Sequence, residues 1–282
     1  MITLRRQKKM KITGIKTACF SPTGNTKTIV DIIGKRLAEK LEVSLEAYDF
    51  TLPKEREKIL SFQEGELAVV GAPVYAGRIP NKILPYIQHG LKGNGALAIP
   101  VVTFGNRSYG DALLELRNEL ENRGFHTIAA AAFAAEHAFT AKLAVGRPDE
   151  EDRKMIEKFA ASAADQIIHM EEMPVRIAVG EERTVRAYYT PLGTDGKPAV
   201  FLKAKPVTKE SCTGCRLCAK VCPMGSISVD DPAQVTGICI KCQACVKICP
   251  VHAKYFDDPA FLSHVAMLEQ NYERKAENRI FI

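Results

Sequence analysis

The chain has 282 residues, of which 46% are hydrophobic and 26% are charged, so its composition is globular and excludes an intrinsically disordered protein. Its net charge of +6 comes from six lysines and arginines among the first sixteen residues, and the remaining 33 basic residues balance the 33 acidic ones. This distribution excludes an extended basic face for nucleic acid and predicts a basic tail at residues 1–10. No run of about 20 apolar residues occurs, so we expect no membrane interaction and a cytoplasmic location.

Between residues 11 and 171, apolar strand patterns alternate with helical patterns. The expected strands are 12–20, 43–50, 67–71, 96–104 and 127–135, and the expected helices are 26–41, 81–89, 111–123 and 149–172. Apolar strands separated by helices indicate a parallel sheet that is buried on both faces. We therefore predict an α/β domain at 11–171 with a doubly wound, five-stranded parallel sheet.

The pattern changes after this domain. Residues 172–208 are rich in proline and glycine and read as a connector between two domains, with a hairpin in it. A smaller, cysteine-rich α+β domain is expected at 209–256. The spacing of apolar residues predicts a helix at 259–277, within a C-terminal segment at 257–282.

Eight of the nine cysteines lie in two segments that each have the spacing C-x2-C-x2-C-x3-C-P, repeated after 27 residues. A short loop with a thiolate at every third residue can bind three corners of a [4Fe–4S] cubane, and the fourth ligand then comes from the other repeat. Structural zinc is the alternative, but zinc sites use separated cysteine pairs. The spacing predicts two clusters, one on Cys212, Cys215, Cys218 and Cys249, the other on Cys222, Cys239, Cys242 and Cys245.

The cysteine domain resembles the bacterial-type two-cluster ferredoxins. The resemblance covers about fifty residues, and no residue of the ligand pattern departs from it. It implies two low-potential [4Fe–4S] clusters that lie close enough to exchange electrons. The remaining thiol, Cys19, is expected to be a small buried apolar residue, and the six histidines form no catalytic motif.

Three loops follow the first, third and fourth expected strands, at the edge where doubly wound sheets bind ligands. In the first loop, hydroxyl and amide side chains surround a glycine at a helix N-terminus, which suits a phosphate but also an ordinary helix cap. The other two loops combine glycines with aromatic residues that could flank a planar ring. The candidate residues are Ser21, Thr23, Gly24, Asn25 and Thr26 in the first loop, Pro73, Val74, Tyr75, Ala76, Gly77 and Arg78 in the second, and Thr103, Phe104, Gly105, Asn106, Arg107, Tyr109 and Gly110 in the third.

These three loops resemble those of the flavodoxin family, and the likeness covers residues 11–171. The resemblance implies FMN, with its phosphate in the first loop and its ring between the other two. Because the chain has no tryptophan, ring stacking is expected from Tyr75, Tyr109 or Phe104. Arg78 and Arg107 replace the acidic residues of many flavodoxins, and we hypothesise that they raise the flavin potential. The alternative is that each pairs with a carboxylate or packs against the connector.

The order of the two domains resembles the flavodoxin–ferredoxin fusion proteins of anaerobic bacteria and archaea. It implies a redox carrier in which FMN and two [4Fe–4S] clusters exchange electrons and serve a partner protein of unknown identity. One alternative is an FMN-dependent reductase of a small acceptor, although no dedicated catalytic acid is visible. Another is that one domain has lost its cofactor and acts as a docking surface. A homo-oligomer is compatible with the sequence.

Overall fold

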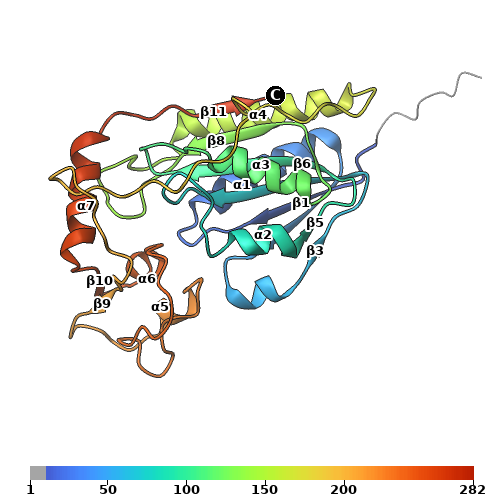
Figure 1. Ribbon diagram of the computed structural model, residues 1–282. Coiled ribbons are helices and arrows are strands. Elements are labelled where there is room, and N and C mark those ends of the chain that lie inside the picture. Colours follow the sequence, from blue (N-terminus) through green and yellow to red (C-terminus); the bar gives the residue numbers. More distant parts are fainter. Residues whose placement is uncertain (1–10) are drawn as a thin grey trace, which may run out of the picture.

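The computed structural model describes residues 11–282, so the predicted basic tail at 1–10 lies outside the described part of the chain. A twisted sheet forms the centre of the first domain (Figure 1). Its strands are β1 (Gly14–Cys19), β2 (Ser44–Asp49), β4 (Glu66–Pro73), β6 (Leu97–Phe104), β7 (His126–Thr127), β8 (Ala130–Ala134) and β11 (Arg279–Phe281). The apolar runs form strands because almost every residue of β4, β6 and β8 is buried on both faces of the sheet.

Helices cover the two faces of this sheet. One layer holds α1 (Asn25–Leu41) and α4 (Glu150–Ile168), and the other holds α2 (Leu84–Gly90) and α3 (Ala112–Asn122). Each layer closes its own apolar core, with Ile33 and Phe159 in the first and Leu113 and Leu116 in the second. No helix within residues 11–282 combines the length and the apolarity that crossing a membrane requires.

The order of the parallel strands defines the fold. Strands β2, β1, β4, β6 and β8 lie side by side in that order, and all their pairings are parallel. This is the flavodoxin-like order 2-1-3-4-5, in which the chain changes direction across the sheet between β1 and the next core strand. Loops at the carboxyl ends of β1 and β4 therefore border the crevice where this fold binds its ligands.

The sheet differs from the predicted five parallel strands in two ways. The strand expected at 127–135 is interrupted, so β7 and β8 pair separately with β6. The C-terminal strand β11 pairs antiparallel with β8, in the register Ile280 opposite Ala131. The five predicted strands do form a parallel sheet, but the antiparallel strand at its edge was not predicted, because a three-residue strand far along the chain gives no periodic signal of its own. Its pairing covers the otherwise open edge of β8.

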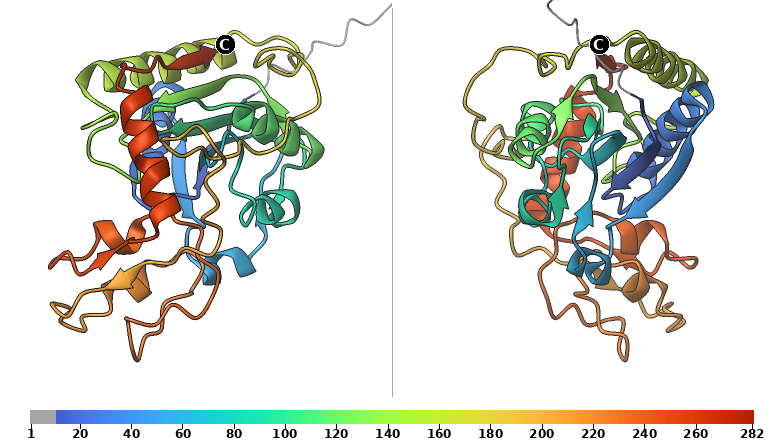
Figure 2. Two further views of the ribbon diagram at one scale, coloured as in Figure 1. Left: turned by 60° about the vertical axis from the view of Figure 1, so that its left-hand side comes forward. Right: turned by 90° about the vertical axis from the view of Figure 1, so that its right-hand side faces the viewer.

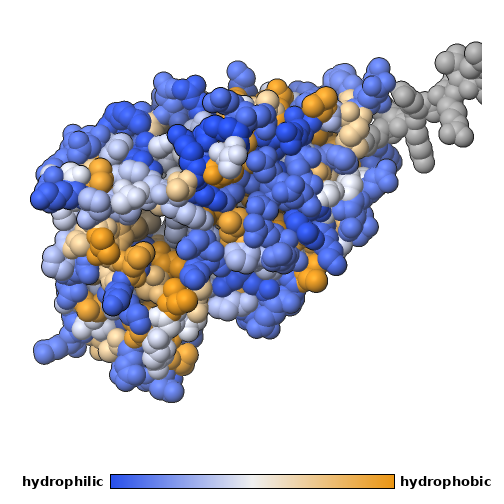
Figure 3. Space-filling model, viewed as in Figure 1, coloured by the Kyte–Doolittle hydropathy of each residue, from blue (hydrophilic) through white to orange (hydrophobic). Residues whose placement is uncertain are grey.

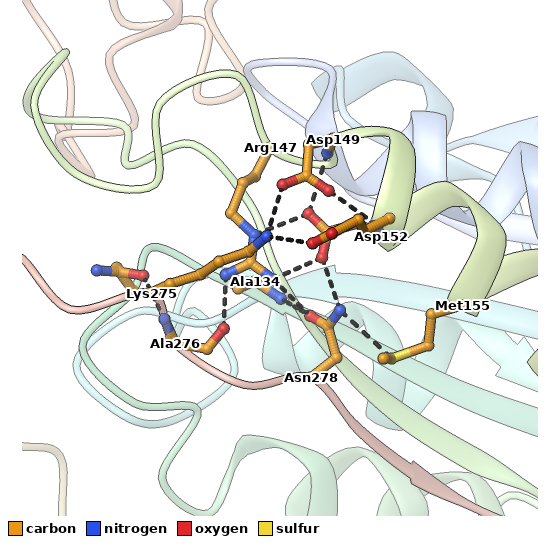
Figure 4. A network of polar contacts seen from close by, with 10 residues as sticks. Ala134, Arg147, Asp149, Asp152, Met155, Lys275, Ala276 and Asn278 are labelled. Atoms are coloured by element: carbon orange, nitrogen blue, oxygen red, sulfur yellow. Dashed lines mark hydrogen bonds and ion pairs between the residues drawn. The ribbon is translucent and has the colours of Figure 1, made fainter.

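A buried polar network fastens this C-terminal strand (Figure 4). The Arg147 guanidinium binds the Asp152 carboxylate through two hydrogen bonds of 2.7 and 2.6 Å and donates a third to the Ala276 carbonyl. Asn278 donates to Asp152 (2.8 Å) and accepts a hydrogen bond from the N–H of Ala134 in β8 (2.9 Å). The network thus joins the start of α4, the sheet edge and the C-terminal segment.

Short elements make up the rest of the chain. Next to the α/β sheet lie η1 (Pro53–Glu57) and the strand pair β3 (Leu60–Ser61) and β5 (Leu91–Lys92), which the sequence patterns did not predict. The cysteine domain holds β9 (Val207–Thr208), α5 (Leu217–Lys220), α6 (Ala244–Lys247) and β10 (Lys254–Tyr255), and α7 (Pro259–Asn271) follows it. Figure 2 shows this domain at one end of the α/β domain, with α7 running from it towards β11.

Candidate functional site

The first loop leaves the N-terminus of α1 open to a ligand. Gly24 has a φ of 89°, in the left-handed region that favours glycine, and nothing lies where its Cβ would be. The Ser21 hydroxyl accepts a hydrogen bond from the N–H of Lys27 (2.9 Å) and thus caps one donor. Within residues 11–282, three further backbone N–H groups in this loop and in the first turn of α1 donate no hydrogen bond: those of Thr23, Asn25 and Thr26. Free N–H groups at a helix N-terminus fit a phosphate.

The side chains of this loop fix its position. Thr26 Oγ1 lies 2.6 Å from Thr103 Oγ1, and both residues are buried, so this hydrogen bond ties the first loop to the end of β6. The Asn25 amide donates to the carbonyl of Glu136, in the loop after β8 (3.1 Å). Lys27 instead binds Asp31 (2.6 Å), one turn along α1, so its charge is paired on the helix surface.

The second loop is a tight turn. Tyr75 and Arg78 exchange two backbone hydrogen bonds of 2.8 and 3.1 Å, and the central residues Ala76 and Gly77 have φ values of 50° and 76°. Positive φ at both central positions is typical of a type I′ hairpin turn. A Cβ on Gly110, in the third loop, would lie 2.5 Å from the Gly77 carbonyl oxygen, so the two loops touch through their backbones.

The third loop is anchored from behind. A Cβ on Gly105 would clash with the His137 ring, which packs against the loop. Burial and the nearby cationic groups lower the pKa of His137 to about 4, so this ring is neutral at pH 7. Asn106 is buried, and its amide group binds the backbone of Tyr272, Arg274 and Ala276. The expected contact of the Asn106 side chain with a ligand is corrected, because its hydrogen-bonding groups hold the C-terminal segment.

Two of the three candidate stacking rings remain accessible. Phe104 is only 5% exposed and belongs to the core, with its ring centroid 5.7 Å from that of Tyr109. Its expected role as a stacking ring is therefore corrected to a packing role. Tyr109 and Tyr75 are half-buried and lie in loops that touch each other. These two tyrosines stay the candidates for contact with a planar ring.

Arg78 is neutralised by a buried carboxylate. Its guanidinium makes two hydrogen bonds to Glu115 of α3, and the same carboxylate accepts the N–H of Ile79 (2.9 Å). Its carbon Cζ also lies 4.7 Å from the ring centroid of Tyr188 in the connector. The hypothesis that Arg78 raises a flavin potential is therefore corrected in favour of the alternative that it pairs with a carboxylate.

Arg107 differs because no ion pair with it occurs within residues 11–282. Its guanidinium carbon lies 3.9 Å from the ring centroid of Tyr189, a cation–π contact with the connector, and its Nη2 approaches the tip of the second loop at Gly77. Tyr189 also donates its N–H to the carbonyl of Ala76 (2.8 Å). Arg107 thus packs against the connector as the alternative proposed, and it keeps its charge beside both loops.

The connector lies across these loops, and the sequence patterns did not reveal this. Asp111, at the start of α3, accepts hydrogen bonds from both Arg183 and Arg186. The hydrogen bond from Arg183 is the main reason that the pKa of Asp111 falls well below its usual range. The one sequence signal was the pair Tyr188 and Tyr189, two neighbouring aromatic residues in the connector.

The eight clustered cysteines line two separate pockets, with four in each. In each pocket three cysteines come from one repeat and the fourth from the other, and these are the two sets that the spacing predicts. One pocket is lined by Cys212, Cys215, Cys218 and Cys249, the other by Cys222, Cys239, Cys242 and Cys245. Cys19 is buried at the end of β1, outside both pockets.

The 27-residue repeat is also a repeat of backbone conformation. Left-handed residues occur at equivalent places in the two halves, and each half has a short helix, α5 and α6, after its second left-handed residue. The equivalent left-handed pairs are Gly214 and Lys241, Arg216 and Gln243, and Gly225 and His252. Non-glycine residues in this region are strained, so a demanding local geometry is maintained in both halves. The pairing of Lys254 with Thr208 likewise repeats that of Ile227 with Val235.

The environment of the thiols suits metal-bound sulfur. Backbone N–H groups of Ser226 and Ala253 point at the sulfurs of Cys222 (3.3 Å) and Cys249 (3.2 Å), again 27 residues apart. Burial raises the pKa of the Cys245 thiol to about 12. A buried thiolate therefore needs a cationic centre to form at neutral pH, and N–H groups aimed at sulfur stabilise the charge that a ligated thiolate keeps.

The pocket of Cys222, Cys239, Cys242 and Cys245 lies next to the strand-end loops. Tyr75 lies in the second of these loops, and burial is the main reason that the pKa of its hydroxyl is raised well above its usual range. Ile240, from the wall of this pocket, packs against the core of the α/β domain. An ion pair between Lys247 and Glu136 (2.8 Å) and a hydrogen bond from Arg56 to the Pro223 carbonyl hold the two domains together.

Comparisons with known proteins give separate matches for the two parts of the chain. Residues 211–254 match the family model of the 4Fe-4S dicluster domain. A search of curated proteins finds no match. Among solved structures, a flavodoxin from the domain Archaea is 16% identical, with a TM-score of 0.42 over 56% of this chain and 100% of its own. Oxidised Flavodoxin 2 from Bacillus cereus is 18% identical, with a TM-score of 0.42 over 55% of this chain and 99% of its own.

These structural similarities are weak, so the fold assignment is based on the strand order and not on them. The order of β2, β1, β4, β6 and β8 makes the first domain flavodoxin-like. The chain therefore joins a domain with the flavodoxin-like strand order to a segment, residues 211–254, that matches the model of the 4Fe-4S dicluster domain. The three strand-end loops and the two cysteine pockets are therefore the candidate functional sites of this chain.

Proposed function

We propose that this protein carries electrons between FMN, bound at the three strand-end loops, and two [4Fe–4S] clusters, and that it serves a separate redox partner protein. One observation carries the proposal: each of the two pockets is lined by four cysteines, and one pocket lies beside the loops. FMN exchanges one or two electrons and a [4Fe–4S] cluster exchanges one, so together they couple one-electron to two-electron chemistry.

The residues of the loops fit the parts of FMN. The free N–H groups at the start of α1 would bind the phosphate, and the hydroxyl of Thr23 adds a neutral donor. Tyr75 and Tyr109 would contact the ring, and the close backbone contact of Gly77 with Gly110 brings the second and third loops together. Arg107 supplies a positive charge near the ring, which favours its reduced, more negative form.

The two cysteine pockets differ in their position relative to the flavin loops. The pocket of Cys239 and Cys242 is proximal, because Ile240 from its wall packs against the core of the α/β domain. The pocket of Cys212 and Cys249 is distal, and its Cys215 is exposed to solvent. Electrons would therefore pass between the flavin site and the distal pocket by way of the proximal one. The connector across the second and third loops favours a carrier over a reductase that needs an open flavin.

Substitution of the two crossing cysteines tests this assignment. After anaerobic reconstitution, we expect the wild-type protein to hold two [4Fe–4S] equivalents and one FMN. Cys222→Ser should impair only the proximal cluster, and Cys249→Ser only the distal one, because each residue completes the other repeat's site. Cys19→Ser, outside both pockets, is the matched control and should change neither. Iron and sulfide analysis measures the cluster content of each variant, and EPR shows which cluster signal is lost. The assignment is refuted if Cys222→Ser and Cys249→Ser remove the same signal.

The cytoplasmic location stays a prediction from the sequence.

A further inference from the structure

An exposed apolar face lies beside the proximal pocket. It consists of two adjacent segments, residues 198–206 and 234–241, which we call the lysine face. Lys205 donates a hydrogen bond to the Val235 carbonyl (2.7 Å), and Lys241 donates one to the Leu202 carbonyl, so the two segments lie side by side. Three apolar side chains on them are largely exposed: Val200 (75%), Leu202 (84%) and Ile238 (54%). Figure 3 shows apolar residues gathered on this side of the molecule.

The inner side of the lysine face forms one wall of the proximal pocket. Pro206 from the first segment, and Val235, Ile238 and Cys239 from the second, all line that pocket. Ile238 is exposed on the outside and lines the pocket on the inside. The ring of Phe201, in the first segment, packs in the same apolar cluster as Cys239. A protein docked on this face would therefore lie one layer of residues from a proposed cluster ligand.

The charge of the face is one-sided. Its two segments contain Lys203, Lys205 and Lys241 and no aspartate or glutamate. Lys203 and Lys205 are exposed, so their charges face solvent beside the apolar residues. An apolar centre with charges of one sign around it is typical of an interaction site, and the complementary surface is acidic. A second copy of this chain would bring like charges together and does not fit.

We propose that the lysine face docks an acidic electron-transfer protein, which exchanges one electron with the proximal centre through Cys239. One centre is oxidised by one electron as the other is reduced by one, and no bond or proton need move. The inference rests on the proposed function and names the surface and the charge of the partner. Transient redox complexes bury less surface than stable ones, so docking of this kind does not require a large interface.

Charge reversal on the face tests this inference in the full holoprotein. The probe is a purified acidic flavodoxin, and electron exchange with the reduced protein is followed by stopped-flow spectroscopy at several ionic strengths. Lys203→Glu/Lys205→Glu should lower the second-order rate constant about tenfold at low salt and flatten its salt dependence. The control Lys209→Glu/Lys220→Glu has the same net charge but lies outside the face, and it should change the rate less than twofold. Leu202→Ser should slow exchange at every salt concentration.

Three results would overturn the inference. The two charge variants could slow exchange equally, which would indicate a general charge effect or docking at the distal pocket. Both could leave the rate unchanged, so that the face has no part in docking. Sedimentation could also show a dimer that Leu202→Ser dissociates, in which case a second copy occupies the face. Equilibration between flavin and clusters is measured in the same samples. If flavin and clusters do not equilibrate in the wild type, the proposed function is wrong. If they equilibrate normally but the variants do not behave as expected, only the proposed docking surface is wrong.

Discussion

Replacing Asp152 by asparagine should release the C-terminal strand and lower the stability of the flavodoxin-like domain. The Asp152 side chain is 3% exposed and is the counter-ion of the equally buried Arg147. Burial alone would raise its pKa, but hydrogen bonds from Arg147 and Asn278 outweigh burial and lower the pKa to about 2. The fall from an ordinary value of about 3.8 corresponds to about 2 kcal/mol of folding free energy.

The cost of the substitution should exceed that figure. Asp152→Asn keeps the shape of the side chain but leaves the Arg147 guanidinium buried without a counter-ion, and breaking a buried pair costs about 3–5 kcal/mol. Because asparagine can still accept one hydrogen bond, we expect a loss of about 3 kcal/mol. Glu151→Gln, in the same helical turn but with a side chain 83% exposed, is the control and should cost less than about 1 kcal/mol.

Urea unfolding of the holoprotein, followed by far-UV circular dichroism, measures the effect. The midpoint should fall at an unchanged slope, and hydrogen exchange should become faster at Ala134 and in β11, where the network is attached. The pH dependence has a definite sign. A carboxyl group with a lowered pKa stabilises the fold above its unfolded pKa, so the wild type should lose its advantage over Asp152→Asn as the pH falls from about 4 to 2. Equal midpoints for both proteins at pH 7 would refute this reasoning.

Two further predictions concern the flavin loops. Arg107→Gln should lower the two-electron midpoint of bound FMN by about 20 mV, since loss of one unpaired charge near the ring is worth about 1 kcal/mol. Removal of the Tyr189 side chain should leave the charge of Arg107 in place and shift the midpoint less. Spectroelectrochemistry measures both shifts, and a larger shift for the Tyr189 variant than for Arg107→Gln would contradict the role of Arg107. Gly105→Ala should weaken FMN retention at least tenfold, because its Cβ would clash with His137 and displace the third loop. Gly14→Ala, whose nearest neighbour would be 3.4 Å away, is the control in a fluorescence titration of FMN.

The sequence predicted those features that depend on local spacing. Apolar strand runs and helical periods predicted the core elements, because burial on both faces of a sheet leaves a clear pattern. The cysteine spacing also predicted which four thiols the structure brings together in each pocket, because the crossing of the fourth ligand follows from the geometry of a short loop. Both features depend on residues that are close together in the sequence.

Features that depend on distant segments could not be predicted. Asn106 looked like a ligand-binding residue of the third loop, but its amide group holds backbone groups more than 160 residues later. From the sequence, Arg78 was expected to carry an unpaired charge near the flavin, but in the structure it pairs with Glu115 of α3. Strand β11 has three residues, too few for a periodic signal, and its place on β8 depends on the buried pair of Arg147 and Asp152. Such contacts follow from the tertiary fold, and no local pattern encodes them.

The most direct test of the account is whether flavin and clusters exchange electrons within one molecule. The flavin of the reconstituted holoprotein is reduced by a laser flash under anaerobic conditions, and cluster reduction is followed at rising protein concentrations. We expect cluster absorbance to change at a rate independent of protein concentration, because the proximal pocket and the flavin loops belong to one packed unit. A rate that rises in proportion to concentration, or a protein that binds clusters but no FMN, would contradict it.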